Sequence, residues 1–367
     1  MTQSNFNDIL AQYQQDRNKA KSESKDNSNL RITVLGGGSF GTAMANLATR
    51  NGCDTIMWIR DQDAAKEIQE TKINKRYLPD FKLEDKLKVS SDLEASVKGR
   101  DLILVAIPSH SFRKVLKQIA PLITAQAVVS LTKGIEKDSF CFMSDIIRQE
   151  LPEVPYGVLS GPNLAKEIVQ GMPAGTVIAS HSEQLRNAVQ GALHSALFRV
   201  FASDDVHGVE LGGALKNIYA VAMGMGAAYN VGENTKSMLI TRALAEMSRF
   251  AVRLGANPLT FLGLSGVGDL FATCNSPLSR NYQVGFALGQ GKSLDQAVEE
   301  LGQTAEGINT IEQVKARSEE LEVYMPITCA LYEVIFNHAP PLSVALSLME
   351  NGHRSDVEFV LPHQSES

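Results

Sequence analysis

The sequence predicts an α/β protein with two parts: an N-terminal domain built on a doubly wound parallel sheet, and a C-terminal domain made only of helices. Three observations carry this prediction. A glycine-rich turn near residue 36 joins an apolar run to a helix-forming run; strand-like and helix-like runs then alternate to about residue 205; beyond it, helix-forming runs dominate. Such alternation is typical of parallel sheets covered by helices on both faces.

The glycine-rich turn is the most specific of these features. Gly36, Gly38 and Gly41 have the spacing G-x-G-x-x-G, after the apolar run 32–35 and before the helix-forming run 42–48. Glycines at this spacing let the backbone approach a pyrophosphate, which the N–H groups at the start of the next helix can bind. The turn therefore predicts a Rossmann-like dinucleotide site; the alternative is a turn that only packs a helix closely on the sheet.

The remaining elements follow from apolar periodicity. Further strands are predicted at 55–59, 102–107, 127–131, 156–159 and 176–179, with helices at 64–70 and near 112–119. In the second half, helices are predicted at 209–229, 237–254, 281–288, 294–301 and 310–321. The chain then divides into a polar N-terminal extension (1–29), a dinucleotide-binding Rossmann-like domain (30–205), a helical substrate and catalytic domain (206–358) and a C-terminal tail (359–367).

Composition excludes several classes of protein. The 367 residues are 44% hydrophobic and carry a formal net charge of −6 with a pI near 5.7, which argues against a nucleic-acid partner. The longest apolar run, Ile218–Tyr229, is too short for membrane insertion, which needs about 20 apolar residues. Residues 1–29 lack the apolar core of a secretory signal.

The cysteines and histidines show no metal-ligand spacing, so no metal site is predicted. The cysteines lie far apart, without a C-x-x-C pair, at Cys53, Cys141, Cys274 and Cys329. We expect buried free thiols in a reducing compartment, and hence a cytoplasmic protein.

Arg60 and Asp61 bear on the choice of nucleotide, because they lie 19 and 20 positions after Gly41, at the end of the second predicted strand. An acidic residue there bonds the ribose 2′-OH of NAD, whereas a basic residue can bind the 2′-phosphate of NADP. Arg60 therefore favours NADP and Asp61 keeps NAD open. A solvated charge pair is the third interpretation.

Lys216 and Asp269 are candidates for proton transfer. Lys216 lies among small and apolar residues at 210–219, where burying a lysine is costly unless it has a partner or a function. Burial or a nearby cation would lower its pKa and suit it to acid–base work; otherwise the side chain extends to the surface. Asp269 follows two glycines at 266–268, which predicts a tight turn that presents a carboxylate, or a helix N-cap.

Other polar residues fall where a ligand is expected. Ser279, Arg280 and Asn281 open a predicted helix, and an arginine beside free backbone N–H groups is a good phosphate site. Lys133 and Asn163 each follow a predicted strand, at the edge where open α/β sheets bind ligands. The alternatives are surface ion pairs for the charged residues and a helix N-cap for Asn163.

Taken together, these motifs resemble those of the NAD(P)-dependent glycerol-3-phosphate dehydrogenases of the bacterial type, from about residue 31 to the final helices. The segments that carry the resemblance are Gly36–Ala43, Ser130–Glu136, Leu159–Pro162, Glu210–Asn217, Gly268–Leu270, Ser279–Asn281 and Ala305–Gly307. The resemblance implies a 6-phosphogluconate-dehydrogenase-like fold with the site in the cleft between the two domains, and a homodimer.

The resemblance also implies the reaction, a reversible hydride transfer that reduces dihydroxyacetone phosphate to sn-glycerol 3-phosphate for glycerophospholipid synthesis. Lys216 matches the general acid and base, Lys133 a second lysine that lowers the pKa of Lys216, and Asp269 the residue that orients Lys216. The implied substrate-binding residues are Lys133, Gly161, Asn163, Lys216, Asp269, Ser279, Arg280 and Asn281. The implied NAD(P)-binding residues are Gly36, Gly38, Ser39, Phe40, Gly41, Arg60, Lys133, Ala165, Arg280 and Glu306.

The chain departs from the family pattern at two of these positions. Asn163 stands where serine or threonine is usual, and Phe40 where tryptophan is often found. One alternative is a β-hydroxyacid or ketopantoate reductase, against which the phosphate-directed Lys133 and Ser279–Asn281 argue. Another is a non-catalytic NAD(P) sensor, which would have no need of a proton donor such as Lys216.

Overall fold

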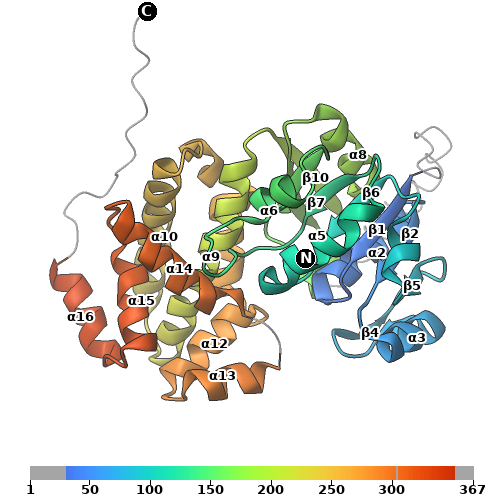
Figure 1. Cartoon of the computed structure of the whole chain (residues 1–367). Helices are drawn as coiled ribbons and strands as arrows, with labels where there is room; N and C mark the ends of the chain where they lie inside the picture. Colours follow the sequence, from blue (N-terminus) through green and yellow to red (C-terminus); the bar gives the residue numbers. More distant parts are fainter. Residues whose placement is uncertain (1–29, 303–304, 352–367) are drawn as a thin grey trace, which may run out of the picture.

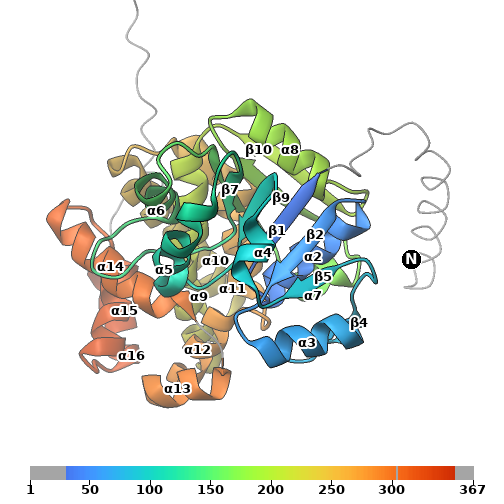
Figure 2. The same cartoon turned by 45° about the vertical axis from the view of Figure 1, so that its right-hand side comes forward.

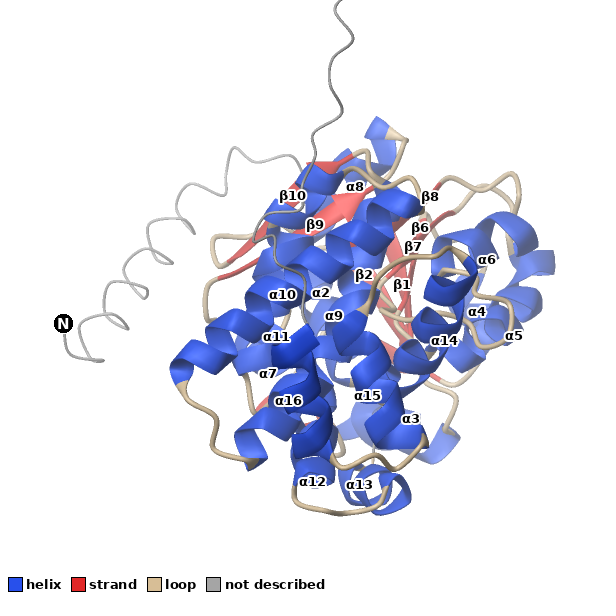
Figure 3. Ribbon diagram, turned by 90° about the vertical axis from the view of Figure 1, so that its left-hand side faces the viewer, coloured by secondary structure: helices blue, strands red, loops and turns tan. Residues whose placement is uncertain are grey.

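The computed structural model describes residues 30–302 and 305–351. The segments predicted as an N-terminal extension and a C-terminal tail lie outside these residues. A domain built around a sheet lies beside a domain built of helices (Figure 1), and the strands are confined to the first of them (Figure 3).

The main sheet has eight strands in the order β10-β9-β8-β7-β6-β1-β2-β5. They are β1 (Arg31–Leu35), β2 (Asp54–Trp58), β5 (Lys88–Ser90), β6 (Leu102–Val105), β7 (Ala127–Ser130), β8 (Tyr156–Ser160), β9 (Ala174–Ala179) and β10 (Phe198–Ser203). A separate antiparallel hairpin consists of β3 (Ile73–Asn74) and β4 (Leu78–Lys82).

Helices cover both faces of the sheet, which is why the central strands are apolar throughout (Figure 2). One face packs against α2 (Ser39–Arg50), α3 (Gln62–Thr71), α7 (Ala165–Val169) and α8 (Glu183–Leu193). The other packs against α4 (Leu93–Val97), α5 (Ser109–Ile119) and α6 (Met143–Glu150). This is the doubly wound arrangement that the sequence predicts.

One strand pair departs from the predicted parallel sheet, because β9 runs antiparallel to β8. A parallel neighbour needs a crossover that returns the chain to the start of the sheet, usually a helix of about a dozen residues with its loops. The connection at 161–173 contains only α7, a helix of 5 residues. The chain therefore reverses at the carboxyl edge, and the remaining neighbouring pairs of this sheet are parallel.

The helical domain is assembled around α9 (Val206–Ala228), which is buried along most of its length. The other helices are α10 (Glu233–Arg253), η3 (Pro258–Leu262), η4 (Leu264–Gly268), α11 (Asp269–Asn275), α12 (Arg280–Gly289), α13 (Leu294–Leu301), α14 (Glu306–Glu320), α15 (Pro326–Phe336) and α16 (Pro341–Asn351). None of the helices in the described part of the chain has both the length and the apolar character that crossing a membrane requires.

Glycines set how closely α12 lies on α9. A Cβ added at Gly224 of α9 would lie 2.0 Å from the carbonyl oxygen of Tyr282, and one added at Gly285 of α12 would lie 2.0 Å from that of Val221. A side chain at either position would force the helices apart. This contact fixes α12 on α9 and so brings the start of α12 close to Lys216.

Candidate active site

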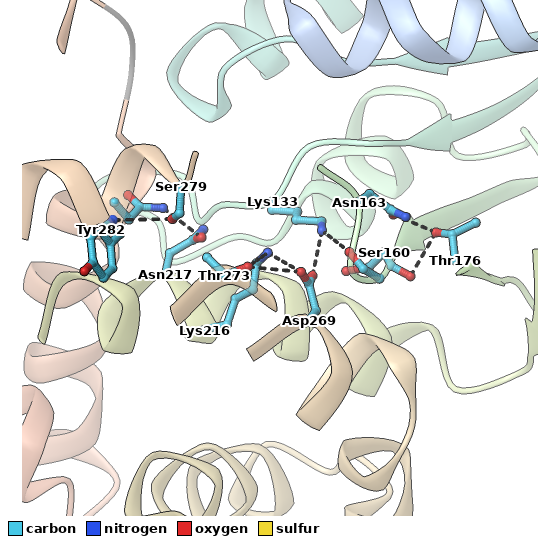
Figure 4. A network of polar contacts seen from close by, with 12 residues as sticks. Lys133, Ser160, Asn163, Thr176, Lys216, Asn217, Asp269, Thr273, Ser279 and Tyr282 are labelled. Carbon is cyan, nitrogen blue, oxygen red and sulfur yellow. Dashed lines mark hydrogen bonds and ion pairs between the residues drawn. The ribbon is translucent and has the colours of Figure 1, made fainter. Parts of the chain in front are cut away.

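The site lies where the carboxyl ends of β7 and β8 face α9 and α11 (Figure 4). Lys133 follows β7 and Gly161 follows β8, while Lys216 comes from α9 and Asp269 from α11. The sheet domain and the helical domain thus each contribute one lysine.

Asp269 joins the two lysines. Lys133 Nζ donates hydrogen bonds to Asp269 Oδ2 at 2.6 Å and to the Gly161 carbonyl oxygen at 2.8 Å. Lys216 Nζ forms an ion pair with Asp269 Oδ1 and donates to Thr273 Oγ1 at 2.5 Å. The Asp269 side chain is 1% exposed and the Lys216 side chain 8%, so one buried carboxylate is shared by two ammonium groups.

Burial lowers the pKa of Lys216 from its ordinary value of 10.5 to about 7. The charge of Asp269 opposes this shift, and the charge of Lys133 adds to it. An amine that titrates near neutral pH can both give and take a proton, which is the property that general acid–base catalysis requires.

The structure corrects the prediction of a tight turn or N-cap at Asp269. The π-helical segment η4 runs directly into α11, and Asp269 is the first residue of α11, after the N-cap position at Gly268. A Cβ at Gly212 of α9 would lie 2.3 Å from the Ser265 carbonyl oxygen, so this glycine lets α9 lie against η4. That close approach brings Lys216 and Asp269 together.

The start of α12 forms a second polar group beside the lysines (Figure 4). Ser279 caps α12 by accepting a hydrogen bond from the Tyr282 N–H, as a helix start predicts. Asn281 Nδ2 donates to Asn217 Oδ1 at 2.8 Å, and Asn281 Oδ1 accepts from the Gly307 N–H at 2.9 Å. Arg280, the first residue of α12, keeps an exposed side chain and has Glu306 within electrostatic range.

Asn163 is not a helix N-cap, because that position of α7 belongs to Leu164. Its side chain instead holds the end of β8 to β9. Asn163 Nδ2 donates to the Gly175 carbonyl oxygen at 3.1 Å, and its Oδ1 accepts from Thr176 Oγ1 at 2.9 Å. Gly161, two residues earlier, presents its carbonyl oxygen to Lys133.

The glycine-rich turn lies between β1 and α2, and close contacts require two of its glycines, Gly36 and Gly41. Gly36 has φ +120°, and a Cβ there would lie 2.3 Å from the Ala106 carbonyl oxygen. A Cβ at Gly41 would lie 2.2 Å from the Gly36 carbonyl oxygen. Gly38, the N-cap residue of α2, has no atom within 4 Å of its Cβ position, and Ser39 and Phe40 begin the helix. The open space at a helix N-terminus fits a dinucleotide pyrophosphate.

Three further residues were predicted to bind the cofactor: Arg60, Ala165 and Glu306. Arg60 is exposed after β2, whereas Asp61 caps α3 by accepting from the Ala64 N–H at 3.0 Å. Ala165 begins α7. Glu306 begins α14 and accepts hydrogen bonds from the Ser109 N–H at 3.0 Å and the Ser109 hydroxyl at 2.6 Å, so it joins the helical domain to the start of α5.

The sequence analysis assigned no role to three residues of this site: Thr273, Asn217 and Ser109. Thr273 lies four positions after Asp269, so on one helix the two share a face, and this spacing was an available signal. Asn217 adjoins Lys216, but its contact with Asn281 depends on the packing of α12 on α9. Ser109 follows the predicted strand 102–107 but has no nucleophile arrangement around it in the sequence, and its partner Glu306 is distant in sequence.

A doubly wound sheet with this turn, facing a buried lysine–aspartate group on a helical domain, defines a nicotinamide-dependent oxidoreductase. Sequence comparisons give the family. The profile for the N-terminus of NAD-dependent glycerol-3-phosphate dehydrogenase matches residues 31–186, and the profile for its C-terminus matches residues 205–345. The chain belongs to this family, and it uses NAD or NADP.

Individual relatives agree. The chain is 80% identical over 334 residues to glycerol-3-phosphate dehydrogenase (NAD(P)+) of Acinetobacter baylyi, covering 91% of this chain and 94% of that protein. It is 65% identical over 339 residues to the enzyme of the same name from Psychrobacter cryohalolentis, covering 92% and 79%.

Solved structures show the same fold. The glycerol-3-phosphate dehydrogenase of Coxiella burnetii superposes with a TM-score of 0.85 at 36% identity, over 88% of this chain and 99% of that one. A ketopantoate reductase from Ralstonia eutropha superposes with a TM-score of 0.55 at 19% identity, over 88% and 100%, a likeness of fold alone.

Proposed function

We propose that this chain reduces dihydroxyacetone phosphate to sn-glycerol 3-phosphate reversibly, with Lys216 as the proton donor. The observation that carries the proposal is the buried Lys216–Asp269–Lys133 group at the edge of the sheet, where both domains meet. The bound nicotinamide supplies or accepts the hydride. The residues of the chain must therefore bind the ketone, stabilise the charge that develops on its oxygen, and transfer one proton.

Lys216 transfers that proton. As hydride adds to the ketone carbon, negative charge develops on the oxygen, and the Lys216 ammonium gives it a proton and becomes a neutral amine. In the oxidation of the alcohol, the neutral amine takes the hydroxyl proton. A pKa of about 7 serves both directions, and Asp269 and Thr273 hold Nζ in place by accepting its hydrogen bonds.

Lys133 has a different task. Its side chain is 17% exposed and reaches the same carboxylate from the sheet side, so its ammonium can contact the substrate oxygen while remaining paired. Its positive charge lowers the pKa of Lys216. Lys133 therefore stabilises the developing oxyanion and keeps Lys216 ready to lose its proton.

The start of α12 binds the substrate phosphate in this proposal. Arg280 supplies a fork of donors at a helix N-terminus, where backbone N–H groups also favour an anion. Asn281 is held by Asn217 and Gly307, so it supports this helix start from within the protein. Gly161 and Asn163 border the substrate from the sheet side, and Ser279 caps the helix.

The cofactor lies on the glycine-rich turn, with Arg60 binding the 2′-phosphate of NADPH. Asp61 caps α3 through one carboxylate oxygen, whereas the exposed Arg60 carries the charge that a 2′-phosphate requires, so NADPH is the preferred cofactor. Ser39 and Phe40 adjoin the pyrophosphate, while Ala165, Arg280 and Glu306 border the nicotinamide side of the cleft.

The assay is the loss of reduced-nicotinamide absorbance when the purified protein is given dihydroxyacetone phosphate, with NADPH and then NADH. Rapid oxidation that requires the substrate, faster with NADPH, is expected. Oxidation with ketopantoate but not with dihydroxyacetone phosphate would assign the chain to the reductases that share its fold. Cofactor binding without turnover of either ketone would make it a sensor.

The assembly, location and pathway belong to the same proposal: a cytoplasmic homodimer whose product feeds glycerophospholipid synthesis. Free thiols at all four cysteines fit a reducing compartment. Exposed apolar side chains such as Leu259 and Leu262, 56% and 60% exposed, are available for a subunit contact. Sedimentation equilibrium at the mass of one chain would contradict the homodimer, and cell fractionation tests the location.

A further inference from the structure

Asn74, in the β3–β4 hairpin, reaches the glycine-rich turn from a distant part of the chain. It is 2% exposed, and its Nδ2 donates hydrogen bonds to the Gly37 carbonyl oxygen at 2.9 Å and to Thr42 Oγ1 at 2.9 Å. Figure 2 shows β4 beside α3, on the side of the sheet domain where α2 lies. The buried Asn74 amide nitrogen thus binds one residue just before α2, Gly37, and one residue in the first turn of α2, Thr42.

The hairpin that carries Asn74 is itself fixed. Lys72, which precedes it, donates from Nζ to the Leu87 carbonyl oxygen at 2.7 Å and accepts at its own carbonyl from the Leu83 N–H at 2.7 Å. Leu78, which begins β4, is 3% exposed and belongs to the core of the sheet domain. Asn74 is therefore a fixed donor placed against the glycine-rich turn.

The geometry of the peptide bond gives this contact a consequence. In a planar trans peptide the carbonyl and the N–H point in opposite directions. Asn74 holds the carbonyl of the Gly37–Gly38 peptide, so the Gly38 N–H of the same peptide points away from the hairpin. Gly38 is the N-cap residue of α2, with open space around its Cβ position.

A peptide bond between two glycines needs a contact from another part of the chain to fix its orientation. Neither residue has a Cβ to restrict its dihedral angles, so the unit can rotate and present its carbonyl where the N–H should be. A carbonyl oxygen facing a pyrophosphate would repel it, whereas an N–H donates a charge-assisted hydrogen bond. The choice between the two orientations therefore controls cofactor affinity.

We propose that Asn74 is a positioning residue for the cofactor: by holding the Gly37 carbonyl, it directs the Gly38 N–H toward the pyrophosphate. This inference rests on the proposed placement of the cofactor on the glycine-rich turn. NADPH and NADH both contain the pyrophosphate, so Asn74 affects the affinity for both cofactors equally, whereas Arg60 affects the ratio of the two affinities.

The test is direct fluorescence titration of NADPH and NADH with Asn74→Leu, a variant of similar size without donors. The dissociation constants for both cofactors are expected to rise about tenfold or more, the effect of one misdirected charge-assisted hydrogen bond. The turnover rate at saturating cofactor and the KM for dihydroxyacetone phosphate stay near the wild-type values. Thr42→Val is the matched control: it removes the other acceptor of Asn74 and leaves both dissociation constants within about twofold.

Equal dissociation constants in Asn74→Leu, Thr42→Val and the wild type would overturn the inference, as would equal weakening by the two variants. Asn74→Asp is the second variant if the leucine protein does not fold. Its carboxylate cannot donate to the Gly37 carbonyl, so weaker binding of both cofactors is again expected, and wild-type affinity would overturn the inference.

A third variant separates this inference from the proposed function. Ser39→Asp places a negative charge at the start of α2 and is expected to weaken the binding of both cofactors severely. If it does so while Asn74→Leu and Asn74→Asp do not, only the role of Asn74 fails. If Ser39→Asp binds like the wild type, the cofactor does not lie on this turn, and both proposals fail together.

Discussion

Replacing Asp269 by asparagine keeps the size of the side chain and removes the charge shared by Lys133 and Lys216. In the wild type that charge opposes the effect of burial on the pKa of Lys216, which nevertheless falls to about 7. Without it, the pKa of Lys216 falls further, and the buried amine remains neutral near neutral pH. The loss of stability should therefore depend on pH in a way that a simple loss of contacts would not.

The sign follows from the protons bound in each state. The pKa of Lys216 is lower in the folded protein than in the unfolded chain, so between pH 7 and 10.5 the unfolded chain holds more protons and the free energy of unfolding rises with pH. Below pH 7 this contribution is constant in the wild type. In Asp269→Asn the Lys216 amine stays neutral below pH 7. The free energy of unfolding of this variant therefore continues to rise with pH over that range, with the same slope as between pH 7 and 10.5.

The free energies of unfolding of the wild type and Asp269→Asn should consequently diverge below pH 7, by about 1.4 kcal/mol for each pH unit. The divergence is about 1 kcal/mol at pH 6 and about 3 kcal/mol at pH 5, and it is negligible at pH 8. The lost ion pair of Lys133 adds an offset of roughly 1–3 kcal/mol that does not depend on pH. The buried acids Glu210 and Glu246, each with a pKa raised to about 7 by burial, titrate in both proteins and cancel in the difference.

Urea denaturation of both proteins at pH 8, 7 and 6 measures this difference. The matched control compares Lys216→Met with the double variant Lys216→Met/Asp269→Asn. Their free energies of unfolding should differ by the same amount at all three pH values, because no Lys216 amine is left to titrate. A stability difference that is the same at all three pH values in the Lys216 background would refute the titration of Lys216 near neutral pH.

Three other substitutions test separate parts of the site. Lys133→Met removes the charge that lowers the pKa of Lys216, so the fall in reduction rate with rising pH should move to higher pH, read from a pH–rate profile. Arg60→Ala should raise the KM for NADPH about tenfold and that for NADH little; equal effects would exclude a 2′-phosphate contact. Gly212→Ala puts a Cβ 2.3 Å from the Ser265 carbonyl oxygen and should cost about 2 kcal/mol in urea denaturation; wild-type stability would contradict that close contact.

Much of the fold could be predicted because its signals are local. The turn at Gly36–Gly41 lies between β1 and α2 as its spacing indicates, and α13 at Leu294–Leu301 has the predicted bounds. Other predicted elements are present with shifted ends: α9, predicted at 209–229, begins at Val206 because Asp205 caps it. The strands β3, β4, β5 and β10 were not predicted. The first and third have only 2 and 3 residues, Pro79 interrupts β4, and Arg199 interrupts the apolar run of β10.

The site could be predicted only where chemistry is unusual in its local context. Lys216 stood out because a lysine among glycines and apolar residues needs a partner, and the structure gives it Asp269. The hydrogen bond from Asn74 to the Gly37 carbonyl could not be predicted, because it depends on how the β3–β4 hairpin packs against the start of α2, which is distant in sequence. Contacts between distant segments are set by packing, and no local pattern records them.

The most direct test of Lys216 as the proton donor compares Lys216→Met with the wild type in NADPH oxidation by dihydroxyacetone phosphate, alongside NADPH titration of both proteins. The turnover rate of the variant should fall by about a hundredfold or more, the contribution of a positioned acid, while its affinity for NADPH stays within about twofold of the wild type. A folded variant that binds NADPH and turns over at the wild-type rate would show that another group gives the proton.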